Sequence, residues 1–350
     1  MNSKLRVRWR FGLTTVMLLL TACNNSATTR ASTPTTIVVT PTVAPIAAPA
    51  ATQTPVSAAP SLTNAPHTTI PVGHIPIGIY FGGGAVWVLN ARSNTVSRID
   101  PATNRITATI QVGSLPLLGA YGDHALWVSD FSSGTVSRID PVRNKVVATI
   151  EVGNQPEGIA VGESAVWVAQ QRDGTVTRID PATNQRVATI PVGASPRFVA
   201  AGEGGIWVSN NGDGTISRID PRTNRVVATI TVGLAPQSIA AGNGSVWVAN
   251  NGEGTVSRID SKTDQVVVTI PTGPGPDGVA IARDAVWVAG DTGPLLWQIN
   301  PNSNTVVATL RVANEPTIRD GAIQLTLGSG AIWVTNYDAD TIIRVALPSP

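Results

Sequence analysis

The stretch SAVWVAQQRDGTVTRIDPATNQRVATIPVG, residues Ser164–Gly193, decides the fold, because near-copies of it fill almost all of the chain after residue 70. Its tryptophan marks the place of each copy. Six tryptophans are forty residues apart and a seventh follows after forty-six: Trp87, Trp127, Trp167, Trp207, Trp247, Trp287 and Trp333. Self-similarity at a fixed period of this size is the signature of a solenoid, a propeller or an array.

Each copy contains four short apolar runs. In the third copy these runs are Glu157–Gly162, Ala165–Gln170, Thr175–Asp180 and Arg186–Ile190. They are rich in Val, Ile, Ala and Thr and too short for ordinary helices, and Gly, Asp, Pro and Asn occupy the joints between them. Links this short connect only antiparallel neighbours, so one copy predicts a four-stranded meander. Seven such units predict an all-β fold, a seven-bladed β-propeller.

The two ends of the repeat region predict that the ring is closed. The last copy stops after its third strand, Thr341–Ala346, and the first copy is preceded by a spare fourth strand, His67–Gly73. An open stack has no use for this arrangement. In a ring, the N-terminal strand pairs with the last blade as its fourth strand. The edge of that sheet is then no longer left unpaired.

The N-terminal segment predicts export. Residues 1–22 open with four basic residues and continue with the apolar run Phe11–Leu20, which is too short to span a bilayer and is typical of a secretory signal. The sequence Leu20-Thr21-Ala22-Cys23 resembles the lipobox of bacterial lipoproteins. This resemblance implies cleavage before Cys23, lipid attachment to its sulfur, and anchoring to the cell membrane or outer membrane. The alternative is an ordinary signal with an incidental cysteine.

Residues 23–66 separate this signal from the propeller, which we assign to residues 67–350. The segment consists almost entirely of Thr, Pro, Ala and Ser, with Arg30 as its only charge, and predicts a disordered, extended tether. Residues 67–350 hold 22 acidic against 19 basic residues, although the whole chain carries a net charge of +2. The basic isoelectric point therefore says nothing about nucleic acid.

The repeat VWVAN…GTVSRIDP resembles the YVTN, or YncE-like, β-propeller repeat over residues 67–350. Similar propellers include surface-layer proteins, periplasmic binding proteins and streptogramin lyases, so the resemblance implies the fold and leaves the activity open. The lyases use a histidine with acidic residues and a divalent metal near the channel. No matching His–acid motif is found among His67, His74 and His124, and a meander puts the last two on opposite faces.

Positions filled alike in most blades are assigned to the scaffold. The tryptophans are expected to pack between blades. The arginine and aspartate of the SRID motif, such as Arg178 and Asp180, are expected to form structural ion pairs or to cap turns. These positions are not candidates for a site.

One position differs from blade to blade and is the candidate site. It follows the proline that leads into each inner strand and is filled by Ile77, Leu117, Glu157, Arg197, Gln237 and Asp277. Blade seven carries an insertion there, Thr317–Ala322, with Arg319 and Asp320. Inner strands line the central channel, so these side chains should ring one mouth together with His74 from an interblade loop. The alternative is a loop position that simply drifts.

The distribution of charge also favours a site on the interblade-loop face. The interblade and second-to-third-strand loops hold eleven acids against four bases, which should attract a cationic ligand or a divalent cation such as Ca²⁺ or Mg²⁺ and repel nucleic acid. The alternative is that these acids only aid solubility.

The sequence thus predicts an exported, lipid-anchored, monomeric propeller. Its expected role is to bind a small molecule, a cationic ligand or an envelope protein at the interblade-loop face without catalysis. The alternatives are a metal-assisted lyase or hydrolase with acids at the channel mouth, and a purely structural envelope protein.

Overall fold

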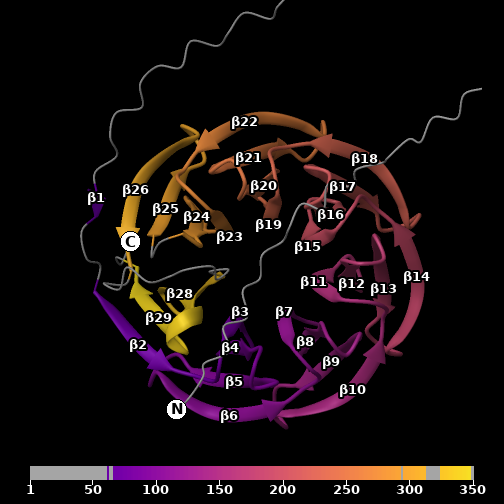
Figure 1. The fold of residues 1–350 in the computed structure, drawn as a ribbon, viewed down its shortest axis with the longest axis vertical. Helices are drawn as coiled ribbons and strands as arrows, with labels where there is room; N and C mark the ends of the chain where they lie inside the picture. Colours follow the sequence, from indigo (N-terminus) through magenta and orange to yellow (C-terminus); the bar gives the residue numbers. More distant parts are fainter. Residues whose placement is uncertain (1–60, 63–65, 293–294, 313–323, 348–350) are drawn as a thin grey trace, which may run out of the picture. The chain divides into compact units, whose positions relative to one another are not determined.

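Seven sheets are arranged around one axis (Figure 1). Six of them contain the four apolar runs of one repeat as antiparallel strands, and the seventh combines the last three runs with the N-terminal strand. The computed structural model describes residues 61–62, 66–292, 295–312 and 324–347. The signal, Cys23, most of the tether, and Arg319 and Asp320 lie outside these residues. All described residues belong to one compact unit, which spans residues 58–350.

The first four blades are regular. Blade one consists of β3 (Pro76–Gly82), β4 (Ala85–Asn90), β5 (Thr95–Asp100) and β6 (Arg105–Gln111). Blade two consists of β7 (Pro116–Gly122), β8 (Ala125–Asp130), β9 (Thr135–Asp140) and β10 (Lys145–Glu151). Blade three consists of β11 (Pro156–Gly162), β12 (Ala165–Gln170), β13 (Thr175–Asp180) and β14 (Gln185–Pro191). Blade four consists of β15 (Pro196–Gly202), β16 (Gly205–Asn210), β17 (Thr215–Asp220) and β18 (Arg225–Thr231).

The last three blades complete the ring. Blade five consists of β19 (Pro236–Gly242), β20 (Ser245–Asn250), β21 (Thr255–Asp260) and β22 (Gln265–Pro271). Blade six consists of β23 (Pro276–Ile281), β24 (Val286–Gly290), β25 (Leu295–Asn300) and β26 (Thr305–Arg311). Blade seven consists of β27 (Leu325–Gly328), β28 (Ala331–Asn336), the 3₁₀ turn η1 (Tyr337–Ala339), β29 (Thr341–Ala346) and the N-terminal strand β2 (His67–Pro71).

The predicted closure is confirmed. Strand β2 pairs antiparallel with β29, with His67 opposite Val345 and Pro71 opposite Thr341. Contacts between blades seven and one add to this pairing, because the Ile75 amide donates to Asp340 at 2.8 Å and Arg344 donates to Asn104 at 3.1 Å. The first and last strands of the propeller are therefore held in one sheet.

A short strand lies in the segment that the sequence assigns to the tether. Strand β1 (Ser61–Leu62) pairs parallel with the outer strand of blade six, at Thr309 and Leu310. The disordered, extended tether over residues 23–66 stays a prediction, with this two-residue pairing near its C-terminal end. The described residues contain no helix long and apolar enough to cross a membrane.

The recurring tryptophan contacts the arginine of the same repeat in six of the seven blades. The seven tryptophans are buried at 0 to 5 % exposure, and an arginine guanidinium lies 4.8 to 5.6 Å from the ring centroid in six blades. Such cation–π contacts are worth about 0.5–1 kcal/mol or more. Arg178 then reaches the next blade, where it donates to the Pro221 carbonyl and to Asn224, both at 2.9 Å.

This contact corrects one expectation and explains an exception. The arginine binds the next blade in blades two to five and in blade seven, whereas Arg98 of blade one donates to Thr107 of its own blade at 3.2 Å. The SRID aspartate caps its own turn, as Asp180 does by accepting the Ala182 amide at 2.8 Å. The turn-cap interpretation is thus confirmed, and the described residues show no ion pair between the two. Blade six carries Gln298 in place of the arginine. Its neighbour, blade seven, has the N-terminal strand as its outer strand and so has no third-to-fourth turn to accept an arginine.

A buried amide stabilises the second strand of most blades. In blade four, Asn210 accepts the Gly193 amide at 3.2 Å and donates to Thr215 and Ser217 at 3.0 and 2.9 Å. Blade two carries Asp130 instead, fully buried, which accepts from Ser137 at 2.7 Å and from Thr135 at 3.1 Å. Burial raises the pKa of Asp130 to about 6, because desolvation outweighs the hydroxyl donors.

We expect Asp130→Asn to stabilise the protein above pH 6. The raised pKa in the folded state means that the contribution of Asp130 to stability is greatest below pH 4 and is lost as pH rises through 6, by about 3 kcal/mol. Denaturant melts should show a gain of that order at pH 8 and almost none at pH 4. The matched control, Asn210→Asp, should introduce the same loss above pH 6, and a pH-independent effect of either variant would contradict this account.

Candidate functional site

The variable position lies at the start of each inner strand, where the seven blades approach the axis (Figure 1). Three of its polar side chains are buried despite their charge or polarity: Glu157 and Asp277 are 3 % exposed and Gln237 is 9 % exposed. Ile77 and Leu117, at the same position in blades one and two, are half-buried. The position is therefore not a drifting surface loop, but a mostly enclosed set of side chains with an apolar and a polar sector.

An ion pair joins blades three and four at this position. Both Nε and Nη2 of Arg197 donate to Oε1 of Glu157, at 2.9 and 2.5 Å. The other carboxylate oxygen, Oε2, is buried and has no hydrogen-bond partner in the described part of the chain. A buried acceptor without a donor costs about 1–3 kcal/mol, so this oxygen is where a bound group would gain most.

A second carboxylate completes the cluster from blade six. Asp277 accepts a hydrogen bond from the Gln324 amide of blade seven at 2.8 Å. Burial and the neighbouring Asp291 raise the pKa of Asp277 to about 7, against the opposing effect of Arg197. Burial would lower the pKa of Arg197, but the Glu157 and Asp277 carboxylates together raise it above its ordinary value. We call Glu157, Arg197, Asp277 and Gln324 the mouth cluster.

The mouth cluster joins residues that are far apart in sequence. Asp277 raises the pKa of Arg197 two blades away, and Arg197 lowers that of Asp277, so the two charges are near enough to interact. Gln237 lies on the intervening inner strand of blade five. Of the predicted site residues, the structure therefore brings together Glu157, Arg197 and Asp277.

Two predicted residues lie outside the described structure and one belongs to another contact. Arg319 and Asp320 are not among the described residues. His74 is exposed, and its Nδ1 lies 2.8 Å from Asp340 in blade seven. This contact ties the first interblade loop to blade seven and includes no member of the mouth cluster.

Two residues near the cluster were not identified from sequence. Gln324 stands one place after the variable position, where the other blades carry Gly, Leu, Phe or Ser. Asp291 follows Gly290, the partner of Pro276 in the strand pairing, and accepts from Asn251 at 3.0 Å. Comparison of the blades one position further along would have singled out Gln324.

Several acids of the same face serve the scaffold. Asp173 accepts the Asn154 amide at 2.9 Å, Asp213 accepts the Ala194 amide at 2.5 Å, and Ser93 and Ser133 do the same for the first two blades. These side chains hold the interblade loops by bonding to backbone donors. Part of the acidic surplus is therefore a structural requirement of the loops.

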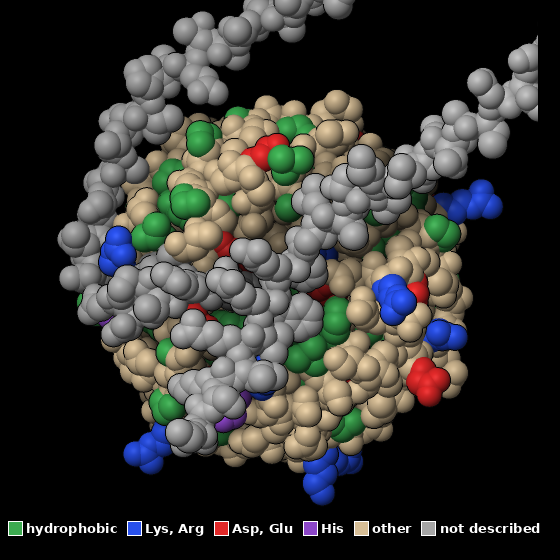
Figure 2. Space-filling model, viewed as in Figure 1, with side chains coloured by type: hydrophobic (Ala, Val, Ile, Leu, Met, Phe, Trp, Pro, Cys, Tyr) green, Lys and Arg blue, Asp and Glu red, His purple; other side chains and the backbone are tan. Residues whose placement is uncertain are grey.

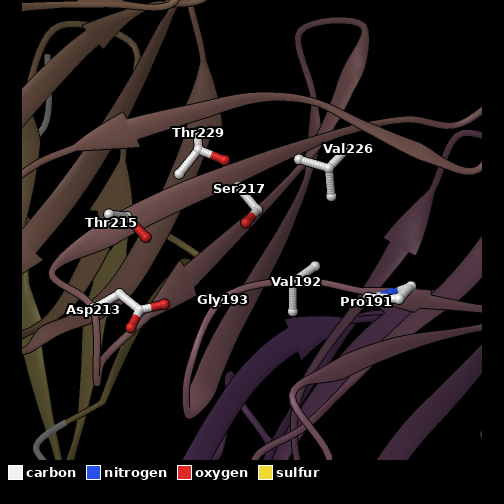
Figure 3. Close-up of a pocket in the computed structure, with 8 residues that line it drawn as sticks. All are labelled: Pro191, Val192, Gly193, Asp213, Thr215, Ser217, Val226 and Thr229. Carbon is white, nitrogen blue, oxygen red and sulfur yellow. The ribbon is translucent and has the colours of Figure 1, made fainter.

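A separate cavity of about 330 Å³ lies between blades three and four, at the outer strands (Figure 3). Pro191, Val192 and Val226 form its apolar wall, and Asp213, Thr215 and Ser217 its polar wall. The polar side chains are already bonded to the scaffold. One blade earlier, Arg186 stands in place of Val226 and donates to the Val152 carbonyl at 3.5 Å. The side chain of residue 226 is therefore smaller than its counterpart one blade earlier.

Comparison with known families gives a match over most of the repeat region. The model of the virginiamycin B lyase family matches residues 113–348. The chain belongs to this family. No curated protein matches the chain.

Solved structures similar to this member of the virginiamycin B lyase family share its fold at low identity. A streptogramin B lyase has a TM-score of 0.71 and 16 % identity and covers 81 % of this chain and 97 % of its own. A catalytically inactive His-to-Ala variant of virginiamycin B lyase from Staphylococcus aureus, solved with quinupristin, has a TM-score of 0.69, 18 % identity and coverage of 81 % and 100 %. Hydrazine synthase from Kuenenia stuttgartiensis has a TM-score of 0.68, 18 % identity and coverage of 78 % and 96 %. The expected relation in fold to streptogramin lyases is confirmed.

The acidic side chains near the mouth are the candidates for metal ligands in this family member. Asp277 and Asp291 supply two neighbouring carboxylates. Among the described residues, however, no group of three or more His, Cys, Asp or Glu side chains is placed to hold an ion. These described donors do not fit a cation held by three or more such side chains.

We expect variants of the mouth cluster to move the pKa of Asp277 in opposite directions. Arg197→Gln removes a nearby positive charge and should raise it above about 7, whereas Glu157→Gln removes a negative charge and should lower it. Carboxyl-carbon NMR titration measures both shifts. Arg92→Gln, an exposed change on the same face, is the control and should leave the titration unchanged. Identical titrations in all three variants would show that the charges do not converge.

Proposed function

We propose that this protein binds a ligand at the mouth cluster without transforming it. The ligand presents a cationic or hydrogen-bond-donating group, such as an amine, to the Glu157 and Asp277 carboxylates. The observation that carries the proposal is the buried Oε2 of Glu157, which has no hydrogen-bond partner among the residues that the structure describes. A hydrogen-bond donor of the ligand would satisfy this oxygen and remove the free-energy cost of burying it without a partner.

Charge at the mouth supports a cationic group. Two carboxylates face one guanidinium in the cluster, and Asp291 adds a further negative charge beside Asp277. A cation placed among them lowers the cost of ionising Asp277, because it opposes the charges that raise the pKa of that carboxyl. The Glu157 and Asp277 carboxylates are already held by hydrogen bonds from neighbouring blades before a ligand binds. This reduces the entropy lost on association.

The opposite sector supports an amphipathic ligand. Ile77 and Leu117 present half-buried apolar side chains at the same position of the repeat. A ligand with an apolar body and a cationic end would contact both sectors, as in most small-molecule sites that combine apolar walls with a few polar groups.

The alternative is a lyase reaction, which family membership favours. A carboxyl with a pKa of about 7 is suited to general acid–base catalysis near neutral pH. In the Staphylococcus aureus relative, however, the inactive variant lacks a histidine. Within the described residues, the hydrogen-bonded mouth cluster contains no histidine, and His74 is bonded to Asp340. Binding is therefore the function that the cluster supports best.

We expect a cationic amphipathic peptide to bind more tightly at pH 8 than at pH 6. Asp277 is mostly protonated at pH 6 and mostly ionised at pH 8, so the affinity should rise about tenfold with pH. Asp277→Asn should remove this dependence and Glu157→Gln should weaken binding, as measured by calorimetry. Asp284→Asn, an exposed change at the opposite end of the strands, is the control.

Other outcomes of the same titration distinguish the alternatives. Ca²⁺ or Mg²⁺ that binds and is lost in Asp277→Asn would indicate a metal site at the mouth. Linearised quinupristin, detected by mass spectrometry, would establish the lyase reaction. If neither peptide, cation nor quinupristin binds, the protein has a purely structural role and the proposal is wrong.

We also propose that the protein is exported and anchored by lipid at Cys23. Cys23→Ser should release it from the membrane fraction and leave the circular dichroism of the propeller unchanged, because the described domain contains no cysteine. Retention of the variant in salt-washed membranes would contradict lipid anchoring.

A further inference from the structure

The end of the blades opposite the mouth cluster carries a different kind of charge. At this end the first strand turns into the second and the third into the fourth, as Gly82 pairs with Ala85 and Asp100 pairs with Arg105 in blade one. We call this surface the turn face. It is formed by backbone turns and presents long side chains to solvent.

Exposed bases gather at the third-to-fourth turns of blades one to five. They are Arg105, Arg143, Lys145, Arg186, Arg222, Arg225 and Lys262. The side chains of Arg143 and Arg222 are 74 % and 89 % exposed, and each also contacts its local aspartate, at 2.8 and 3.6 Å. In Figure 2, Lys and Arg side chains project from the circumference of the ring.

Acids of the same turns are directed inward. The SRID aspartates are half-buried and accept backbone amides of their own turns, as Asp220 does from Arg222 at 2.8 Å. Asp264 holds Arg218 at 2.9 Å. Three acids are exposed elsewhere on the turn face, Asp123, Glu163 and Asp284, and they lie on the first-to-second turns together with exposed Arg283. The exposed charge at the outer turns is therefore positive.

The chain also enters the propeller at this end. Strand β2 begins at His67 opposite Val345, next to the end of β29, and runs from there toward the mouth. The 88 % exposed side chain of Val142 lies on a basic turn of the same face, between Pro141 and Arg143. An apolar side chain among bases suits an interface between water and lipid headgroups.

We propose that the turn face docks on anionic phospholipid. The basic turns lie against the headgroups, and the mouth cluster faces away from the bilayer toward its ligand. The inference rests on the proposed anchoring for its cellular setting, since a lipid at Cys23 would keep the entry point of the chain within the length of the tether from the membrane. The attraction between the bases and the headgroups acts within about 8–10 Å at ordinary salt. It can therefore orient a domain that the lipid anchor already holds near the membrane, even where the turn face alone binds weakly.

The test is co-sedimentation of the full-length Cys23→Ser protein with vesicles. Phosphatidylglycerol mixed with phosphatidylcholine is compared with phosphatidylcholine alone, at low and at high salt. We expect binding that requires the anionic lipid and falls with salt. Arg222→Gln with Arg225→Gln should lower the partition coefficient about 30-fold, because each basic residue near such a surface contributes about fivefold.

The matched control removes the same charge from the other face. Arg92→Gln with Arg172→Gln changes two exposed arginines of second-to-third-strand loops and should leave vesicle binding unchanged. Equal losses in both double variants would show that net charge acts without a docking face. Binding to phosphatidylcholine alone would assign it to the N-terminal segment, and tighter charge-dependent binding to duplex DNA would indicate a nucleic-acid surface. Each of these results overturns the proposal, and none alters the ligand titration at the mouth cluster.

Discussion

The pairing of the N-terminal strand with the last blade is the constraint on which the rest of the structure depends. It joins His67–Pro71 to Thr341–Val345 and makes the seven sheets a ring, so that the starts of the inner strands meet at one axis. Only then do Glu157, Arg197 and Asp277 lie close enough to change one another's ionisation. A ring also has no end blade, and each inner surface is covered by its neighbours.

The repeat separates structural from functional requirements. Tryptophan, arginine and the turn residues are needed wherever two blades meet, and they recur because the contact recurs. Departures from the repeat follow physical causes. Gln298 replaces an arginine where the next blade offers no turn to accept it. In the same blade Gly290 replaces the buried amide, and Trp297 fills the space, because a Cβ at residue 290 would lie 2.6 Å from its ring.

Charged side chains have different environments at the two ends of the strands. At the mouth, carboxylates are buried beside one guanidinium and one amide, where desolvation keeps a proton on Asp277 near neutral pH. At the turn face, aspartates bond to the backbone and bases extend into water. The first arrangement suits recognition of a donor group at a fixed place, and the second suits long-range attraction to an anionic surface.

The sequence by itself determined the blade number, the strands and the closure, and it singled out the one repeat position whose residues differ from blade to blade. It did so because a forty-residue period and turn chemistry are local, and because the spare strand at one end matches the missing strand at the other. It also grouped Glu157, Arg197 and Asp277 by comparison of the blades. Only the tertiary structure decided which of the candidates meet, because burial and ion pairing depend on distances across the channel. His74 contacts Asp340, Gln324 donates to Asp277, and Asp213 accepts a backbone amide of an interblade loop. Each of these contacts forms between residues that become neighbours only when the blades pack into the ring.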